Sequence, residues 1–280
     1  MRFAVPKKGR LEDPATRMLQ QAGFRYERGE RTLSVPVRGR NVELLFVRAD
    51  DICELVTDGV ADLGITGFDL VAESGADIEV LAELGFGQCR LTTAVPNASE
   101  VQSIEELAGL RVATSHPNVT NAFFAGKGID IQTVPLRGSI EVAPKLDVAD
   151  AIVDLVSSGS TMMLNGLRPI SDVLSSQAVL VRDRAAGQMD EVDSAVTLIS
   201  SVVAARRKKY VLMNAPRSAV DEIRALIPGF DAPSIVPLAD ADMVAIHSVV
   251  DVDAVWDVVP QLKAAGASGI LVLPIEQLLI

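Results

Sequence analysis

The first two hundred residues alternate between short apolar segments with strand character and segments with helical spacing. The strand-like segments are residues 2–6 (RFAVP), 42–49 (VELLFVRA) and 61–67 (ADLGITG), and the helical segments after them are 14–23, 50–59 and 68–75. Strands that alternate with helices at this pace predict an α/β fold with a mostly parallel sheet. Aromatic residues make up only 4% of the chain, and the aliphatic interior that this implies suits a sheet buried on both faces.

A second series of alternating segments begins after residues 89–96 (CRLTTAVP). The predicted strands are 110–117, 129–138 and the start of 150–161, the predicted helices are 118–128 and 139–147, and the chain leaves through a strand at 178–183. Two α/β lobes joined by two crossing strands enclose a cleft, and such clefts commonly bind ligands. The same pattern occurs in bilobal solute-binding proteins, so it does not by itself indicate an enzyme.

The last part of the chain has a different order of elements. The predicted strands are 210–216, 234–239, 243–250 and 270–275, and the predicted helices are 217–229 and 252–266. This βαββαβ order is the ferredoxin-like arrangement. Helical spacing places Val252, Val255, Trp256, Val259 and Leu262 on one face of the second helix, which we expect Pro260 to kink. The basic run 206–210 (RRKKY) is interpreted as a solvated junction.

Composition excludes several classes of function. The net charge of −11 argues against a nucleic-acid partner, because phosphate neutralisation needs a basic surface. No apolar run approaches the ~20 residues that span a bilayer, and the N-terminal apolar segment is too short for a signal peptide, so we expect no membrane partner and a cytoplasmic protein. Cys53 and Cys89 are isolated and are expected to be reduced structural thiols. His116 and His247, the only histidines, lie in no recognisable zinc or catalytic-triad motif.

A run of hydroxyl side chains and one glycine follows the predicted strand that begins at Asp150: Ser157, Ser158, Gly159, Ser160 and Thr161. Backbone amides at a helix start bind phosphate, hydroxyls add donors, and glycine allows close approach. Asp150 and Asp154 precede this run, near the end of a strand where α/β folds place their ligands. A ribose 5-phosphate suits such a set, although an ordinary loop with a helix cap explains it equally well. It is neither a Walker A loop nor GxGxxG.

Residues 149–167 (ADAIVDLVSSGSTMMLNGL) resemble the phosphoribosyl-diphosphate loop of the ATP phosphoribosyltransferase family, which starts histidine biosynthesis and whose usual form is close to ADAI-DLVS-G-TL--NGL. Further motifs of the family follow its order: GRL at 9–11, R-DDI at 48–52, DLGITGFD at 62–69, RVAT--P at 111–117 and GSIEVAP at 138–144. The segments APSIVPL (232–238) and GAS-ILVLPIE (266–276) resemble the regulatory domain of the long form. The resemblance covers essentially the whole chain, and it disfavours the shorter form, which needs a partner subunit.

The predicted fold is therefore α/β, with a bilobal, periplasmic-binding-protein-like catalytic region and a C-terminal ferredoxin-like (βαββαβ) regulatory domain. The first catalytic lobe is expected to comprise residues 1–93 with 179–205. The second lobe, which carries the loop, is expected at 94–178, and the histidine-binding regulatory domain at 206–280.

The resemblance implies two sets of substrate residues. Asp154 is expected to bind the ribose hydroxyls of phosphoribosyl diphosphate, and the five loop residues its 5-phosphate. The cleft is expected to be lined by Lys8, Arg10, Arg48, Thr66, Gly67, Asp69, Thr114 and Glu141. Simpler explanations stay open: a lone cation is usually a solvated charge, residues 64–69 make a plain turn, Glu141 is a helix cap, and Asp150 is a solvated or capping acid. Some positions depart from the family: His116 stands where Tyr is frequent, Asp147 where Gly is common, and Met162 and Met163 where Leu is often first.

The C-terminal domain of the long form binds histidine, which inhibits the enzyme by stabilising a tense hexamer. The matching positions here are Asn214, Phe230, Ala232, Ser234, Ser248 and Gly269. Four of these residues are small and leave room for a ligand between subunits, but small residues also simply pack a small sheet. Asn214 replaces an acid found in some members of the family. The resemblance thus implies inhibition by L-histidine and by AMP, and a homo-oligomer between dimer and hexamer.

The chemistry that the resemblance implies is displacement at the anomeric carbon of the ribose by N1 of ATP, with pyrophosphate leaving and no covalent nucleophile on the protein. Mg²⁺ is the expected cofactor, carried on the diphosphate, with no dedicated metal site in the chain. The alternative is a bilobal small-molecule binding protein with an appended sensor domain and no chemistry.

Overall fold

The computed structural model describes residues 1–29, 32–157 and 159–279. Contacts within the chain divide it into a larger unit, residues 1–17 with 24–193, and a smaller unit, residues 18–23 with 194–280. Within the described ranges, none of the helices combines the length and the apolar character needed to cross a membrane.

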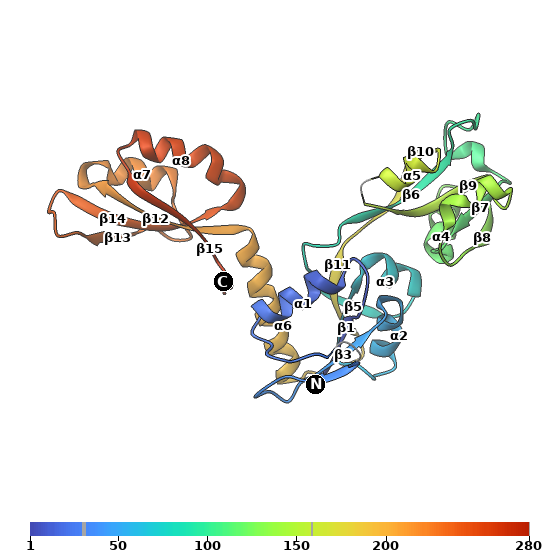
Figure 1. Cartoon of the computed structure of the whole chain (residues 1–280), viewed down its shortest axis with the longest axis horizontal. Helices are drawn as coiled ribbons and strands as arrows, with labels where there is room; N and C mark the ends of the chain where they lie inside the picture. The colour runs from blue at the N-terminus through green and yellow to red at the C-terminus, as the bar shows by residue number, and fades with distance from the viewer. Residues whose placement is uncertain (30–31, 158, 280) are drawn as a thin grey trace. The chain divides into compact units, whose positions relative to one another are not determined.

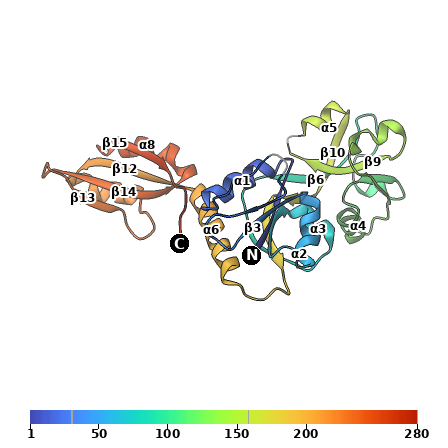
Figure 2. The same ribbon diagram turned by 60° about the horizontal axis from the view of Figure 1, so that its bottom comes forward.

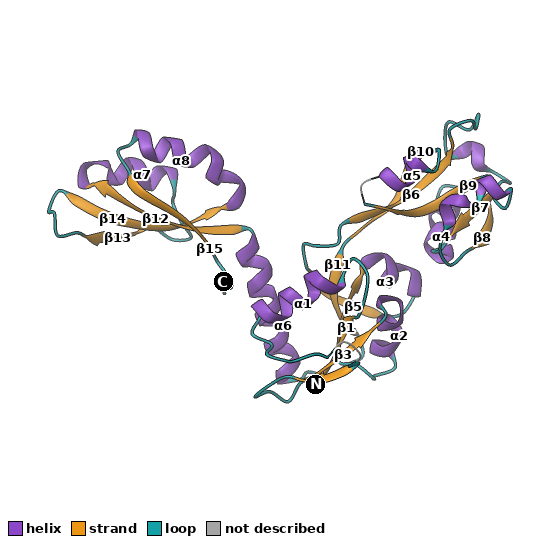
Figure 3. Ribbon diagram, in the orientation of Figure 1, coloured by secondary structure: helices purple, strands orange, loops and turns teal. Residues whose placement is uncertain are grey.

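The larger unit contains a six-stranded sheet that we call lobe I together with its helices. Its strands, in spatial order, are β2 (Ser34–Pro36), β3 (Glu43–Val47), β1 (Arg2–Pro6), β4 (Leu63–Gly67), β11 (Ala178–Asp183) and β5 (Ile78–Glu83). The helical segments are η1 (Ala49–Asp51), a 3-10 turn, α2 (Ile52–Thr57), α3 (Phe68–Ser74) and the first part of α1 (Glu12–Gln21), whose residues from Met18 onward belong to the smaller unit. Strand β4 is buried along its whole length, which fits its lack of charged residues. Helices α2 and α3 pack on one face of this sheet, as Figure 3 shows.

A second sheet, with five strands, forms lobe II of the same unit. Its strands, in spatial order, are β10 (Leu167–Ser176), β6 (Cys89–Pro96), β9 (Ala151–Val156), β7 (Arg111–Thr114) and β8 (Gln132–Pro135). Its helical segments are η2 (Glu105–Leu107), α4 (Pro117–Gly126), η3 (Ile140–Val142), η4 (Pro144–Leu146) and α5 (Ser160–Leu164). Phe124 of α4 is fully buried against Leu91, Leu107 and Val112.

The chain passes twice between the two sheets, as predicted. It leaves lobe I after β5 and enters lobe II at β6, and it returns from β10 to β11 with only Gln177 between the two strands. Figure 1 shows these two strand connections running from one lobe to the other. The predicted α/β architecture with two lobes is therefore confirmed. The prediction of a mostly parallel sheet was wrong: β1 pairs in parallel with β3 and β4, and β7 with β8 and β9, but the remaining pairings of both sheets are antiparallel because β11 and β6 enter them as crossing strands and β2 as part of a hairpin.

The smaller unit contains the predicted ferredoxin-like arrangement. Helix α6 (Asp190–Arg206) leads into β12 (Lys208–Pro216), η5 (Arg217–Ala219), α7 (Val220–Leu226), β13 (Ser234–Pro237), β14 (Met243–Asp251), η6 (Val252–Ala254), α8 (Val255–Ala264) and β15 (Ser268–Pro274). The antiparallel sheet has the order β13-β14-β12-β15. Ile223 of α7 and Leu262 of α8 pack on one face of it, against Val211, Met213 and Ile246. Figure 2 shows α8 over this sheet from a second direction.

Three local predictions were wrong. Residues 139–147 form two 3-10 turns rather than a helix: Pro144 has no amide hydrogen for a helical hydrogen bond to Ile140, and Ser139 and Asp147 bound the segment in left-handed backbone conformations (φ 51° and 57°). Trp256 does not join the apolar face of α8: it is 86% exposed, and Val258 packs on the core instead. The run 206–210 is not a free junction, since α6 ends at Arg206 and β12 begins at Lys208. Helix α6 itself was not predicted.

Candidate functional site

The hydroxyl-rich loop joins β9 to α5 in lobe II. Gly159 adopts a left-handed backbone conformation (φ 77°) immediately before α5 begins at Ser160, which accounts for a glycine at this turn. Met162 is buried and anchors α5 in the core of lobe II. Ser157, Ser160 and Thr161 remain exposed at the surface of the loop, while Ser158 lies outside the described residues. The loop is thus held from beneath and presents hydroxyls outward.

A pocket of about 190 Å³ brings several of the predicted donor-site residues together. Asp154, Ser157, Gly159 and Thr161 line it, and Glu141 from η3 lines it as well. Glu141 was predicted for the cleft from a segment remote in the sequence, so its presence beside the loop is a result of the fold. Helix α5 has only five residues and its dipole is correspondingly weak, so an anion here would depend mainly on hydroxyls and loop amides.

Asp154 has an unusual electrostatic environment for a surface acid. Burial raises the pKa of its carboxyl, and the negative charge of Glu141 raises that pKa further. The hydrogen bond that the Leu155 amide donates to Asp154 Oδ1 (2.8 Å) and the charge of His116 act in the opposite direction but are outweighed. A half-buried acid whose charged form is disfavoured is typical of functional positions rather than of ordinary surface acids.

The other side of the loop faces a second pocket, of about 490 Å³. Arg90 and Thr92 of β6 and Asp172 of β10 line it together with Ser157 and Gly159. Asp172 accepts hydrogen bonds from Arg90 Nη1 and Thr92 Oγ1, both at 2.8 Å. This pairing could not be predicted from local sequence patterns, because β6 and β10 are far apart along the chain and meet only in the sheet.

In lobe I, the first turn of α3, which directly follows β4, carries a buried carboxylate. Asp69 accepts a hydrogen bond from Ser176 Oγ (2.5 Å), lies 3.3 Å from Nε2 of His116 and lies 3.4 Å from the guanidinium of Arg10. Burial alone would raise the pKa of Asp69, but the hydrogen bonds of His116 and Ser176 and the charge of Arg10 outweigh it and lower that pKa. Asp69 is therefore a fixed, charged centre contacted from both lobes.

Gly67 is required by this centre. A side chain at position 67 would place its Cβ 2.3 Å from Oδ1 of Asp69. Thr66, fully buried, donates its hydroxyl hydrogen to the carbonyl of Ala49 (2.9 Å) and so ties β4 to the segment after β3. Residues 66–69, predicted as a turn, form the end of β4 and the start of α3. Thr66 and Gly67 have structural roles within lobe I, and the carboxylate of Asp69 contacts the other lobe.

The three predicted cations have different surroundings. Lys8 is exposed, Arg10 contacts Asp69, and Arg48 is exposed and pairs with Asp50 (3.3 Å). Thr114 is fully buried, and its Oγ1 accepts a hydrogen bond from the backbone amide of His116 (3.0 Å). Thr114 therefore supports His116 rather than facing an open cavity. Neither histidine lies in a recognisable sequence motif, but His116 contacts the carboxylate of Asp69 in the structure.

Asp150 has a structural role. Its carboxylate accepts hydrogen bonds from the backbone amide of Arg111 (2.9 Å) and from the Arg111 guanidinium (Nη2, 2.9 Å). These contacts with Arg111 lower the pKa of Asp150. The pair joins the start of β7 to the start of β9, so Asp150 is neither a free acid nor part of the loop pockets described above.

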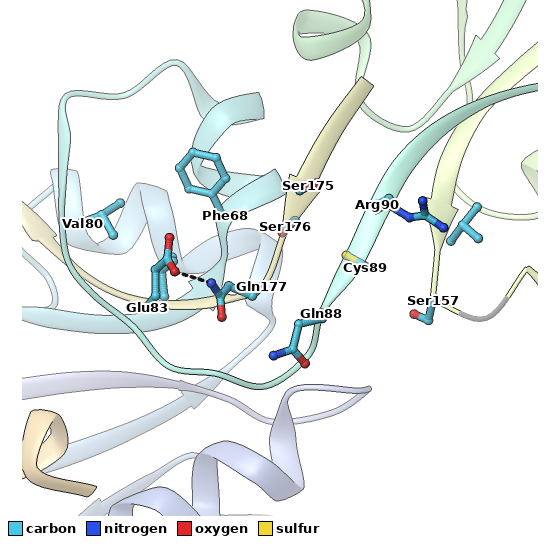
Figure 4. A pocket seen from close by; sticks show the side chains of 12 residues that line it. Phe68, Val80, Glu83, Gln88, Cys89, Arg90, Ser157, Ser175, Ser176 and Gln177 are labelled. Carbon is cyan, nitrogen blue, oxygen red and sulfur yellow. Dashed lines mark hydrogen bonds between the residues drawn. The ribbon is translucent and has the colours of Figure 1, made fainter. Parts of the chain in front are cut away.

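A third pocket, of about 480 Å³, lies at the crossing strands and is shown in Figure 4. Ser176 and Gln177 from the β10–β11 junction line it with Cys89 and Arg90 of β6 and with Ser157 of the loop. The Gln177 amide donates a hydrogen bond to Glu83 (2.6 Å), drawn as the dashed line in Figure 4. Residues of both lobes therefore share one cavity, with Ser157 at its lobe II side.

The residues predicted for histidine binding lie on both faces of the smaller unit's sheet. Asn214 lies beside Gly269 of β15, on the face without helices. Ser248 faces the helices and donates a hydrogen bond to the carbonyl of Ile227 (3.1 Å). Phe230 is 52% exposed beneath the ammonium of Lys208, and Ala232 and Ser234 are exposed. A ligand that contacts all six positions cannot do so from one face of a single sheet.

Comparisons with known proteins agree with this architecture. A family model described as ATP phosphoribosyltransferase matches residues 48–204, and a second, described as HisG, C-terminal domain, matches residues 205–277. The ATP phosphoribosyltransferase of Gemmatimonas aurantiaca is 42% identical over 291 residues, covering 100% of this chain and 99% of the relative. That of Natronomonas pharaonis is 43% identical over 279 residues, covering 99% of each chain.

Among solved structures, the ATP phosphoribosyl transferase (HisG:HisZ) complex from Thermotoga maritima contains a similar chain. It superposes with a TM-score of 0.64 at 27% sequence identity, over 73% of this chain and 98% of that chain. Matches of this extent, to a family model over more than half of the chain and to relatives over its whole length, show that the protein is a transferase belonging to the ATP phosphoribosyltransferase family.

Proposed function

We propose that the protein transfers the 5-phosphoribosyl group of phosphoribosyl diphosphate to N1 of the adenine of ATP, releasing pyrophosphate, as the first step of histidine biosynthesis. One observation supports this function most directly: Asp154, Ser157, Gly159 and Thr161 line a single pocket on the loop between β9 and α5. An amino-acid binder has no need of such a combination of carboxylate, hydroxyls and glycine, whereas a ribose 5-phosphate matches each of them.

In this proposal the loop binds the donor. The 5-phosphate accepts hydrogen bonds from the hydroxyls of Ser157, Ser160 and Thr161 and from loop amides that Gly159 leaves accessible, with Ser158 as a further donor. The carboxylate of Asp154 accepts hydrogen bonds from the ribose hydroxyls. Asp154 is then well placed, by its charge, to stabilise the positive character that develops on the ribose ring as the bond to pyrophosphate breaks.

The residues of this pocket fit a magnesium ion that arrives with the donor. Asp154 and Glu141 would supply oxygen ligands, which Mg²⁺ prefers. Two carboxylates do not complete an octahedral shell, and among the described residues no group of three His, Cys, Asp or Glu is suited to a metal ion. The ion would therefore keep waters and diphosphate oxygens, and it would supply positive charge to the leaving group.

Positioning and electrostatics account for the proposed reaction without a covalent intermediate. Holding N1 of adenine in line with the anomeric carbon contributes on the order of 7–11 kcal/mol through effective molarity. Lys8, Arg10 and Arg48 of lobe I are the cations available to bind the polyphosphates, and Arg10 is already oriented by Asp69. Thr66, Gly67 and Asp69 form the wall of lobe I in this proposal, and Thr114 and Glu141 belong to lobe II.

We further infer that L-histidine, bound by the smaller unit, and AMP inhibit the enzyme in a cytoplasmic homo-oligomer between dimer and hexamer. The distribution of Asn214 and Ser248 over both faces of the sheet supports a histidine site that is completed by a second copy of the chain. The small residues Ala232, Ser234 and Gly269 leave space for that ligand.

A paired assay tests the proposed function. The purified chain is mixed with ATP, phosphoribosyl diphosphate, Mg²⁺ and pyrophosphatase, and phosphoribosyl-ATP is followed by ultraviolet absorbance with and without L-histidine. We expect product that histidine suppresses. Product without suppression would retain the enzyme and remove the proposed histidine site. Ligand binding without any product would instead favour a binding protein with a sensor domain.

A further inference from the structure

Helix α3 of lobe I contacts the first turn of helix α4 of lobe II through one side chain. Glu73 accepts a hydrogen bond from the backbone amide of Asn118 on Oε1 and another from the amide of Val119 on Oε2, both at 3.0 Å. The side chain of Asn118 donates a third to the carbonyl of Glu73 (2.9 Å). Three hydrogen bonds therefore join the end of one helix to the start of another across the lobes.

These bonds replace a cap that α4 does not make for itself. The first amides of a helix have no partner within the helix, and a Ser, Thr, Asp or Asn just before it usually accepts from them. At this position α4 has His116, whose side chain makes no capping hydrogen bond. A carboxylate at a helix N-terminus is also favoured by the helix dipole. Glu73 therefore caps α4 from the other lobe.

Asp69 extends the same contact by one helical turn. Asp69 and Glu73 are four residues apart and so share one face of α3. Asp69 lies 3.3 Å from the ring of His116, the residue that immediately precedes α4. We call the five residues Asp69, Glu73, His116, Asn118 and Val119 the interlobe clasp. Two acids of lobe I thus hold the segment of lobe II that leads into α4.

The clasp acts on the donor loop through the sheet of lobe II. Strand β7 ends at Thr114, directly before this segment, and Thr114 pairs with Val153 of β9. The next residue along β9 is Asp154. The chain crosses between the lobes at two connections, β5–β6 and β10–β11, and a bend at these connections would change the angle between the lobes. A contact between α3 and α4 restricts that bend and so fixes Asp154 relative to the cations of lobe I.

We propose that Glu73 is a positioning residue that holds the two lobes at the angle at which the donor loop faces lobe I. This proposal rests on the proposed transferase function, because the groups that it aligns are the donor loop and the cations of lobe I. The matched variants are Glu73→Gln, which keeps the size but removes the charge, Glu73→Asp, which keeps the charge but shortens the reach, and Glu73→Ala. Glu54→Ala, on the exposed side of α2, is the control.

Hydrogen exchange measured by mass spectrometry reports the clasp directly. We expect the peptide that contains Asn118 and Val119 to exchange faster in Glu73→Ala, at an intermediate rate in Glu73→Gln, and at the wild-type rate in Glu54→Ala. Loss of a helix cap corresponds to about a tenfold rise in local opening. Unchanged exchange in Glu73→Ala would overturn the proposal.

Steady-state kinetics well below the unfolding midpoint separate positioning from stability. We expect kcat/KM for phosphoribosyl diphosphate to fall about tenfold in Glu73→Ala and by a smaller factor in Glu73→Asp. The control Glu54→Ala should keep the wild-type kcat/KM. Faster exchange with kinetics within twofold of wild type would overturn the positioning role. If the wild-type chain makes no product, the proposed function fails. The affinity for phosphoribosyl diphosphate, measured by calorimetry, is then compared among wild type, the Glu73 variants and Glu54→Ala in place of kcat/KM.

Discussion

Replacing Asp69 by asparagine tests the buried centre that the two lobes share. The amide oxygen can still accept from Ser176, but the charge that faces His116 and Arg10 is lost. A hydrogen bond to a charged group contributes about 1.5–3 kcal/mol, and the 3.3 Å separation from His116 argues for the lower end. The Arg10 contact, 3.4 Å long and partly exposed, adds little. We therefore expect Asp69→Asn to lower the free energy of unfolding by about 2 kcal/mol at neutral pH.

The pH dependence of that loss has a definite sign. Asp69 has a folded-state pKa below its ordinary value of 3.8, so its contribution to stability is present above pH 3.8 and is lost as the pH falls through the lower, folded-state pKa. The difference between wild type and Asp69→Asn should therefore be constant from neutral pH down to about 4.5. Below the ordinary pKa it should shrink.

Urea unfolding followed by far-ultraviolet circular dichroism measures this difference. Fluorescence is unsuitable, because the single tryptophan, Trp256, lies in the smaller unit, whereas Asp69 lies in the larger one. Asp58→Asn, at the exposed end of α2, is the control and should stay within about 0.5 kcal/mol of wild type. A loss below about 0.5 kcal/mol in Asp69→Asn, or a difference that grows on acidification, would refute the argument that these contacts stabilise the charged carboxylate.

Three further substitutions or labelling experiments probe the same features. Burial raises the pKa of Asp154, so folding favours its neutral form, and stability is lost as the pH rises through that pKa. Asp154→Asn should therefore keep or raise the free energy of unfolding at pH 7, measured by urea titration, while kinetics show a higher KM for phosphoribosyl diphosphate. A loss of more than about 1 kcal/mol in the free energy of unfolding would contradict this. Gly67→Ala should displace the Asp69 carboxylate and cost about 1–3 kcal/mol, with a pH profile like that of Asp69→Asn in the same denaturation assay. Burial raises the pKa of the Cys53 thiol to about 11, so iodoacetamide should label Cys53 slowly in the folded protein and rapidly in urea, and rapid native labelling by mass spectrometry would show that the thiol is not shielded.

The sequence was most informative where one local pattern decides the structure. Segments without charged residues, such as 63–67, form central strands because both of their faces are covered. The βαββαβ order and the hydroxyl loop before α5 were also readable, since each depends on neighbouring residues. Helix α6, which was not predicted, also has charges typical of helix ends: three acids in its first turn and Arg206 in its last.

Contacts between remote residues could not be predicted in this way. Nothing near His116 in the sequence indicates that it meets Asp69, and nothing near Glu73 indicates that it caps α4. Helical spacing alone also failed for Trp256, because a helix that packs on only one side of a small sheet leaves part of a wide apolar stripe exposed. The predicted helix at 139–147 was wrong for a local reason, since Pro144 in its interior cannot donate the amide hydrogen that a helix needs there.

The position of β11 has a consequence for how the chain folds during synthesis. Strand β11 lies between β4 and β5 in lobe I, with Val179 paired to Thr66 on one side and to Glu83 on the other. It leaves the ribosome only after every strand of lobe II, from β6 to β10, has been made. Domains usually fold in order from the N-terminus as they emerge. Here the N-terminal sheet has to wait for its last central strand, and the sheet of lobe II is the first that can be completed.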